Sequence, residues 1–295
     1  MAAASSSDRK QGASDSAYAG AVATTRQLDP DRYLATLFAP ATSRAPLFAL
    51  YAFNAEIARI REIVSEPIPG EIRHQWWREA LSCKCEDASC ESPIAAALNE
   101  TMRRFHLPPE PLMALIEARG FDLYDDPMPT WLDLEGYCGE TSSTLIRLAT
   151  IILADGEDPG SADTCGHAGV AYALTGLLRA FPIHARRQQC YVPHEVLIAC
   201  GVSHEAIYEG RDSEGLRAAL GAMRQRAREH LEAARAGLCT ASPLIRPAFL
   251  PVCLCAHYLD AMDRPDYRPF ETVIDLSPLR KLWILGRSAW RAKRC

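Results

Sequence analysis

The chain has 295 residues, of which 48% are hydrophobic and 23% are charged, and its formal net charge at pH 7 is -5. This composition is ordinary for a globular protein, and the acidic balance argues against general nucleic-acid binding. No apolar run approaches the ~20 residues that a membrane-spanning helix needs. Residues 1–20 also lack the apolar segment of a secretory signal.

Residues 1–27 are interpreted as a disordered tail. Their alanine and serine content would also suit a short organellar presequence, although Asp8 and Asp15 disfavour one. We therefore expect a location in the bacterial cytoplasm or the mitochondrial matrix, and not secretion.

The eleven cysteines are odd in number and irregular in spacing, which favours reduced thiols. Cys83, Cys85 and Cys90 form a small cluster. Because they lack the paired spacing of a structural zinc site, we interpret them as ordinary thiols.

Residues 28–295 predict one all-α domain. Asp29 and Pro30 begin a short helix, since proline is favoured at the first helical position. Apolar residues between Leu47 and Val64 follow the spacing of one buried helical stripe. No alternating run longer than four residues predicts a strand. Later helices are expected in the segment "HQWWREAL" and at residues 94–106, 110–122, 131–153, 164–181, 216–238, 244–263 and 278–292.

Several stretches between residues 29 and 270 resemble the squalene/phytoene synthase family and lie in that family's order. They are "LYAFN", "SEPIPGEIRHQWWREAL", "DLEGYC", "GVAYALTGLLRAF" and "ARRQQCYVP". The resemblance implies an isoprenoid-synthase-type fold, in which a bundle of helices surrounds a central cavity. In that family the cavity holds two prenyl diphosphates, which are condensed head to head.

This condensation requires that a diphosphate leave an allylic carbon. The family's enzymes neutralise the leaving polyanion with Mg²⁺, a hard cation that prefers oxygen ligands. Two facing helices supply the ligands, each with aspartates spaced so that they share one helical face.

The positions that the resemblance assigns to these aspartates, here called the acidic-motif positions, carry mostly other residue types. Only Glu62 is a carboxylate. At ~4 Å and an effective dielectric of ~20, the charge of Arg59 would repel a divalent ion by about 8 kcal/mol. Pro182 should also bend the second helix. The sequence therefore predicts no Mg²⁺ and no other cofactor here. The acidic-motif positions are Ala58, Arg59 and Glu62 on the first helix, and Ala180 and His184 on the second.

Basic residues remain where the family contacts phosphate. The resemblance matches Arg186, Arg187 and Tyr191 to the paired arginines and the tyrosine of "ARRQQCYVP", and it matches Arg44 and Arg78 to positions that face phosphate. Such arginines can hold an anion by direct contact. Alternatively, they cap helix ends or pair with surface carboxylates.

One branch of the family shows similar losses, namely the mitochondrial assembly factors of respiratory complex I and related bacterial proteins. The segments "GYCGETSSTLIRL" and "LLRAFPIHARRQQCYVP" resemble this branch more than they resemble a synthase. The resemblance implies a non-catalytic protein whose partners are complex I subunits or other assembly proteins.

Two other functions stay open. Asp122, Asp125 and Asp126 could form a displaced Mg²⁺ site, and with Glu62 they would serve an active prenyltransferase of the squalene/phytoene synthase type. An acidic cluster before a proline is, however, also common where a helix passes into a turn. The third possibility is a carrier that holds a prenyl or other lipid diphosphate without turnover.

The segment 279–295 combines Leu282, Trp283, Leu285 and Trp290 with several arginines and lysines. A basic helix with aromatic residues can lie on an anionic membrane surface. The alternative is a docked final helix with a solvated basic face.

Overall fold

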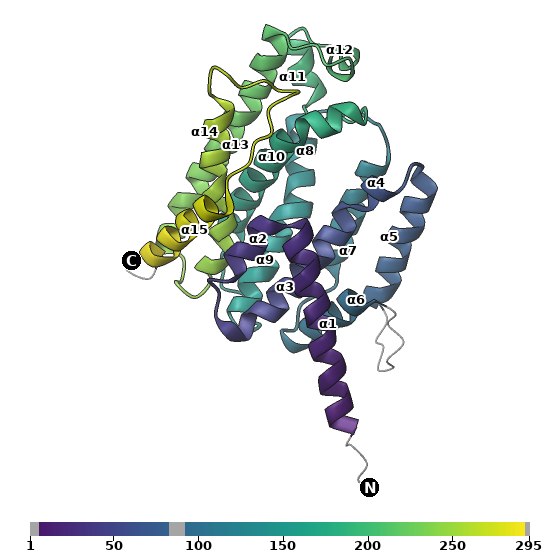
Figure 1. The fold of residues 1–295 in the computed structure, drawn as a ribbon, viewed down its shortest axis with the longest axis vertical. Coiled ribbons are helices and arrows are strands. Elements are labelled where there is room, and N and C mark those ends of the chain that lie inside the picture. The colour runs from purple at the N-terminus through teal and green to yellow at the C-terminus, as the bar shows by residue number, and fades with distance from the viewer. Residues whose placement is uncertain (1–5, 83–91, 293–295) are drawn as a thin grey trace.

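The computed structural model describes the backbone of residues 6–82 and 92–292, so Cys83, Cys85 and Cys90 lie outside the described residues. Within these ranges the chain forms helices and no β-strand, which confirms the all-α prediction (Figure 1). No helix in the described part is both long and apolar enough to cross a bilayer. The helices are α1 (Ser6–Leu28), α2 (Pro30–Thr36), α3 (Ala41–Ala58), α4 (Ile60–Ile63), α5 (Pro67–Ser82), α6 (Pro93–Arg104), α7 (Glu110–Arg119), α8 (Trp131–Cys138), α9 (Thr144–Leu153), α10 (Ala162–Arg186), α11 (His194–Ala199), α12 (His204–Tyr208), α13 (Glu214–Thr240), α14 (Cys255–Met262) and α15 (Pro278–Ala292). Three tighter or wider segments join them: 3₁₀ turns η1 (Gly120–Leu123) and η3 (Arg246–Leu254), and a π-helical turn η2 (Gly139–Ser143).

The N-terminal segment corrects one expectation, because α1 is a helix where the sequence predicted a disordered tail over residues 1–27. Ala17 and Ala21 of α1 are buried against Phe48 and Ala49 of α3. The Thr25 hydroxyl donates a hydrogen bond to the Phe48 carbonyl at 3.2 Å. Small side chains let the two helices approach closely, yet they give α1 little apolar periodicity. Composition alone therefore did not predict that this segment forms a helix packed on α3.

Two predicted helices are divided in the structure. The stripe from Leu47 to Val64 is split at Arg59, which joins the end of α3 to α4. The segment 131–153 forms α8, the π-helical turn η2 and α9 in direct succession. In contrast, α10 continues through Pro182 to Arg186. Periodicity thus located the helices, but the local changes of winding followed from packing.

Helix α10 joins the two main parts of the core. One cluster of buried side chains comes mainly from α3, α6, α7 and α9, and the other from α8, α13, α14 and α15. Along its length α10 packs against α13, α9 and η2. It contributes Cys165, Ala168 and Ala171 to the first cluster and Leu174, Leu178 and Phe181 to the second.

A buried carboxylate fixes the C-terminal helix on this core. Asp31 of α2 accepts a hydrogen bond from the Tyr258 hydroxyl at 2.8 Å. Its carboxylate also lies 2.7 Å from Lys281 Nζ of α15 and 3.2 Å from Arg179 Nη1 of α10. Because an unpaired buried charge is costly, these contacts hold α2, α10, α14 and α15 in one arrangement.

Gly169 of α10 lies directly against the π-helical turn η2. A Cβ atom added at this glycine would overlap the backbone N and Cα atoms of Ser143. Beside it, the Ser143 hydroxyl donates to the Gly166 carbonyl at 2.8 Å. Only glycine therefore allows this spacing between α10 and η2.

We predict that Gly169→Ala lowers the free energy of unfolding by at least about 1–3 kcal/mol, because the added methyl group forces α10 and η2 apart. Gly176→Ala is a matched control on the same helix, since no atom lies within 4 Å of its added Cβ. That variant should be as stable as the parent or up to about 1 kcal/mol more stable. Urea denaturation measures both changes, and equal effects would contradict the packing argument.

Candidate functional site

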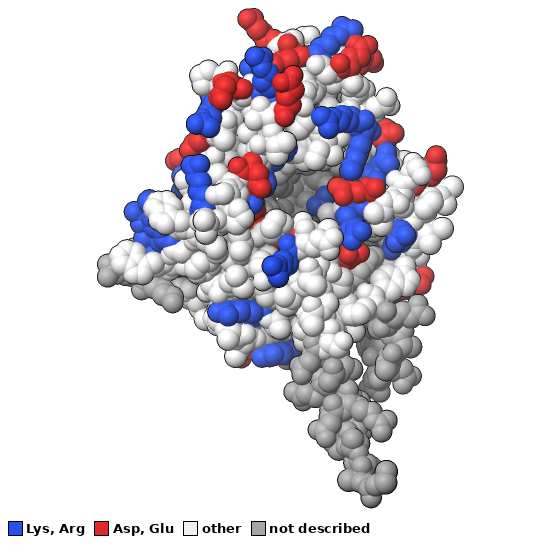
Figure 2. All heavy atoms as spheres, viewed as in Figure 1, with Lys and Arg blue, Asp and Glu red and all other residues white. Residues whose placement is uncertain are grey.

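The segments that carry the acidic-motif positions meet at a hollow in the surface. Figure 2 shows this hollow between the elements that Figure 1 labels α4 and α10, with basic and acidic side chains around it. Glu62 Oε1 of α4 lies 3.4 Å from Arg187 Nη1, just after the end of α10. The first and second motif segments therefore face each other, as the family resemblance implies.

At the first segment, carboxylates are bound by arginines. Ala58 is the last residue of α3 and Arg59 follows it. The Arg59 side chain forms an ion pair with Glu56 at 3.3 Å, one helical turn earlier. Glu62 is paired with Arg187, which follows the end of α10. The one carboxylate among the acidic-motif positions is thus bound to a guanidinium group of the same protein.

At the second segment, an imidazole stands where the resemblance expects a carboxylate. Ala180 and His184 lie on α10, and the His184 ring is 4.8 Å from the Tyr191 ring, centroid to centroid. His184 and Tyr191, together with Phe181 and Met223, line a void of only about 10 Å³, roughly the space of one water molecule. Burial lowers the pKa of His184 to about 4, so the ring is neutral at pH 7.

Asp122 is the centre of a buried hydrogen-bond network. Its Oδ1 accepts from the Tyr137 hydroxyl at 2.8 Å and from the Tyr191 hydroxyl at 2.6 Å. Its Oδ2 accepts from Arg119 Nη1 at 3.0 Å. Burial raises the pKa of both tyrosines well above the ordinary value, so they remain donors. Protein groups thus occupy both oxygens of this carboxylate.

The acidic cluster predicted as an alternative Mg²⁺ site is not brought together. Asp122 is buried, whereas Asp125 and Asp126 are exposed. Asp125 forms an ion pair with Arg61 at 3.2 Å. Across the described ranges, no group of three or more His, Cys, Asp or Glu side chains is placed to hold a metal ion. The residues present therefore do not fit the Mg²⁺ that the fold family implies.

The predicted anion-binding residues are distributed over the molecule. Arg44 lies fourteen residues before Ala58, about 21 Å along α3, and its Nε donates to the Ala39 carbonyl at 2.9 Å. Arg78 of α5 pairs with Glu117 of α7 at 3.0 Å. Arg186 is exposed at the end of α10, next to Arg187. Of the five predicted residues, Arg187 lies at the hollow, and Tyr191 lies behind it in the Asp122 network.

The partners of Asp122 in this network were not predicted from the sequence. Tyr137 lies within the family stretch "DLEGYC", and Arg119 precedes Asp122 by one helical turn, so both positions were in view. The hydrogen bond from Tyr191 to Asp122 joins residues that are 69 positions apart in the chain. No local pattern encodes such a contact.

We predict a pH effect from His184. Its pKa of about 4 in the folded protein lies below the ordinary value of 6.5, so between these values the unfolded chain binds a proton that the folded protein does not. Stability is therefore lost as the pH falls from 7 to 5, by roughly 1–2 kcal/mol from this group. His184→Gln should remove this share of the loss. Urea unfolding at both pH values tests it, and parallel losses for the two proteins would contradict it.

Comparison with known proteins places this geometry in context. The model of the squalene/phytoene synthase family matches residues 25–283. Human NADH dehydrogenase (ubiquinone) complex I, assembly factor 6, is 30% identical over 249 residues, which cover 83% of this chain and 73% of the human protein. Phytoene synthase 2 of Solanum lycopersicum is 26% identical over 262 residues, 86% of this chain and 83% of that protein.

Solved structures of synthases share the fold. A dehydrosqualene synthase in complex with a ligand superimposes with a TM-score of 0.82 at 17% identity, over 96% of this chain and 98% of that one. A squalene synthase from Alicyclobacillus acidocaldarius gives a TM-score of 0.73 at 22% identity, over 86% and 96%. With its isoprenoid-synthase-type helical fold and its homology to complex I assembly factor 6, this chain belongs to the squalene/phytoene synthase family.

Proposed function

We propose that this protein is a non-catalytic member of the family that acts in the assembly of respiratory complex I. The ion pair between Glu62 and Arg187 carries the proposal. In the family, two aspartate-bearing helices bind metal ions between them at this place. Here the guanidinium group of Arg187 joins the two segments in place of a metal ion.

The chemistry of the condensation supports a non-catalytic role. Loss of diphosphate from an allylic carbon needs a concentrated positive charge on the leaving oxygens. A site for divalent ions needs several carboxylates whose oxygens are available. Here Glu62 is bound by Arg187, Asp122 by Arg119 and two tyrosines, and Asp125 by Arg61. A metal ion would have to displace these partners at each carboxylate.

The relatives support the assembly role. The human protein named as an assembly factor of complex I is more similar to this chain than the tomato phytoene synthase is, at 30% against 26% identity. The partners proposed here are accordingly complex I subunits or other assembly proteins. The location would be the bacterial cytoplasm or the mitochondrial matrix.

We predict that the purified protein releases no diphosphate from farnesyl or geranylgeranyl diphosphate in the presence of Mg²⁺. Glu62→Gln should behave like the parent, because Glu62 is not used as a metal ligand. A pyrophosphate assay with an active squalene synthase as positive control measures this. Mg²⁺-dependent turnover that Glu62→Gln abolishes would show that the protein is an active prenyltransferase. Stoichiometric binding of the diphosphate without turnover would instead favour a diphosphate carrier.

We also predict that deletion of the gene in its own organism lowers the level of complex I. Native-gel staining for NADH dehydrogenase activity measures that level. Expression of the parent or of Glu62→Gln should restore it equally, because the proposed role needs no metal bound at Glu62. Normal complex I in the deletion strain would refute the assembly role. If Glu62→Gln is present at a normal level but does not restore complex I, the carboxylate of Glu62 itself is required for function.

A further inference from the structure

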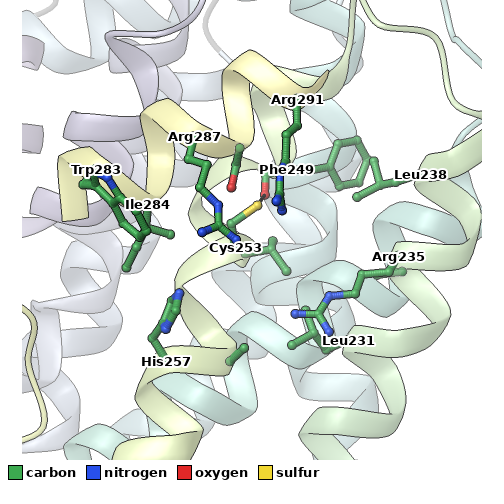
Figure 3. Close-up of a pocket in the computed structure, with 14 residues that line it drawn as sticks. Leu231, Arg235, Leu238, Phe249, Cys253, His257, Trp283, Ile284, Arg287 and Arg291 are labelled. Carbon is green, nitrogen blue, oxygen red and sulfur yellow. Dashed lines mark hydrogen bonds between the residues drawn. The ribbon is translucent and has the colours of Figure 1, made fainter. Parts of the chain in front are cut away.

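A second concave site lies on the α15 side of the molecule, at a place that the proposed function does not use. It is a pocket of about 400 Å³ between α13, η3, α14 and α15 (Figure 3). This volume is within the range of small-molecule sites, which is roughly 300–1,000 Å³. Lys281 of α15, paired with the buried Asp31, holds the helix that forms one wall.

The interior of the pocket is apolar. Leu231 of α13, Phe249 and Val252 of η3, and Ile284 of α15 are all buried and line it. Ala256 of α14 adds a small side chain and leaves space beside these groups. Such a lining favours a hydrocarbon part of a ligand, because its burial removes apolar surface from water.

The opening of the pocket is basic. Figure 3 shows Arg287 and Arg291 reaching from α15, and Arg235 from α13, toward the same space. None of the described aspartates or glutamates lines the pocket. Arg235 reaches Glu232 only at 4.0 Å, and both side chains are exposed. Within the described ranges, Arg287 and Arg291 form no ion pair, although Arg287 lies over the Trp283 ring at 5.1 Å.

We propose that this pocket binds one amphipathic anion, a hydrocarbon chain that ends in a carboxylate or phosphate group. Guanidinium groups recognise both head groups by charge-assisted hydrogen bonds. A neutral hydrophobic ligand would leave the arginines without a counter-charge, and an inorganic anion would leave the apolar wall empty. A ligand that joins the two parts satisfies both.

The volume sets the length of the chain. A group the size of a water molecule occupies about 30 Å³, so the pocket holds roughly a dozen methylene-sized groups. Dodecanoate, with twelve carbons, is therefore the appropriate probe. The site does not depend on the hollow near Glu62, so its test is independent of the role in complex I assembly.

The test is an isothermal calorimetric titration of the purified full chain with dodecanoate, kept below its critical micelle concentration. We expect one molecule bound per chain. Arg287→Gln combined with Arg291→Gln should weaken binding at least tenfold, because two charge-assisted contacts are lost. Arg280→Gln is the matched control, since Arg280 lies on the same helix but does not line the pocket. It should change the affinity less than twofold.

Further probes separate the two parts of the ligand. Dodecyltrimethylammonium has the same chain with a cationic head and should not bind. Ala256→Phe, which fills the apolar space, should abolish dodecanoate binding while circular dichroism stays unchanged. If that variant fails to fold, the arginine variants on the exposed side still decide the question.

Vesicles of phosphatidylglycerol distinguish a dissolved ligand from a membrane lipid. Sedimentation with vesicles that needs Arg287 and Arg291 and is competed by dodecanoate would support the same pocket, filled from a bilayer. Three results would overturn the proposal. They are no saturable binding of dodecanoate, equal binding of the cationic amphiphile, or an equal loss in Arg280→Gln, which would indicate general surface charge.

Discussion

The arrangement of this protein depends on one electrostatic constraint, namely that a carboxylate buried in a helical bundle needs a cation beside it. Asp31 and Asp122 are the buried acidic residues of the described chain. Lys281 and Arg179 neutralise the first, and Arg119 neutralises the second. Removing one partner from such a buried pair costs about 3–5 kcal/mol, so each pair fixes the elements that carry it. Through these contacts α10 is held between α2 and α15 on one side. On the other side, the segment that follows α10 is held to η1, and through Asp122 to α8, by hydrogen bonds.

The same pairing rule extends to exposed carboxylates that lie on, or pair with arginines of, the acidic-motif segments, and it limits their ability to bind a metal ion. Glu62, Glu56 and Asp125 are each matched by an arginine. Exposed pairs of this kind stabilise a fold by only about 0–1 kcal/mol. Their chemical consequence is larger, because a carboxylate that already faces a guanidinium attracts a divalent ion far less strongly. The charge pattern therefore opposes metal binding without adding much stability.

Much of the fold followed from the sequence because helical periodicity is local. The bounds of α15 and the existence of α10 and α13 were predicted from the spacing of apolar residues. The helix α1 was missed because its buried face is made of alanines. The π-helical turn η2 was missed because its close approach to Gly169 of α10 is a long-range contact that helical periodicity does not report. At the site, the resemblance located Glu62 and Arg187, but neither their ion pair nor the links of Asp122 to Tyr137 and Tyr191 could be predicted, since they join distant parts of the chain.

The residues that hold this fold together are largely separate from those at the acidic-motif positions. The acidic-motif positions lie at the end of α3, in α4 and near the end of α10, and Glu62 is more than half exposed. Glu62 forms its ion pair with Arg187, outside the two buried charge networks, whereas the His184 ring packs on Tyr191 of the Asp122 network. Substitution of Glu62 therefore leaves both buried networks intact. A bundle built in this way can exchange metal-binding residues for other types at little cost in folding free energy, and its remaining surfaces stay available for partners and ligands.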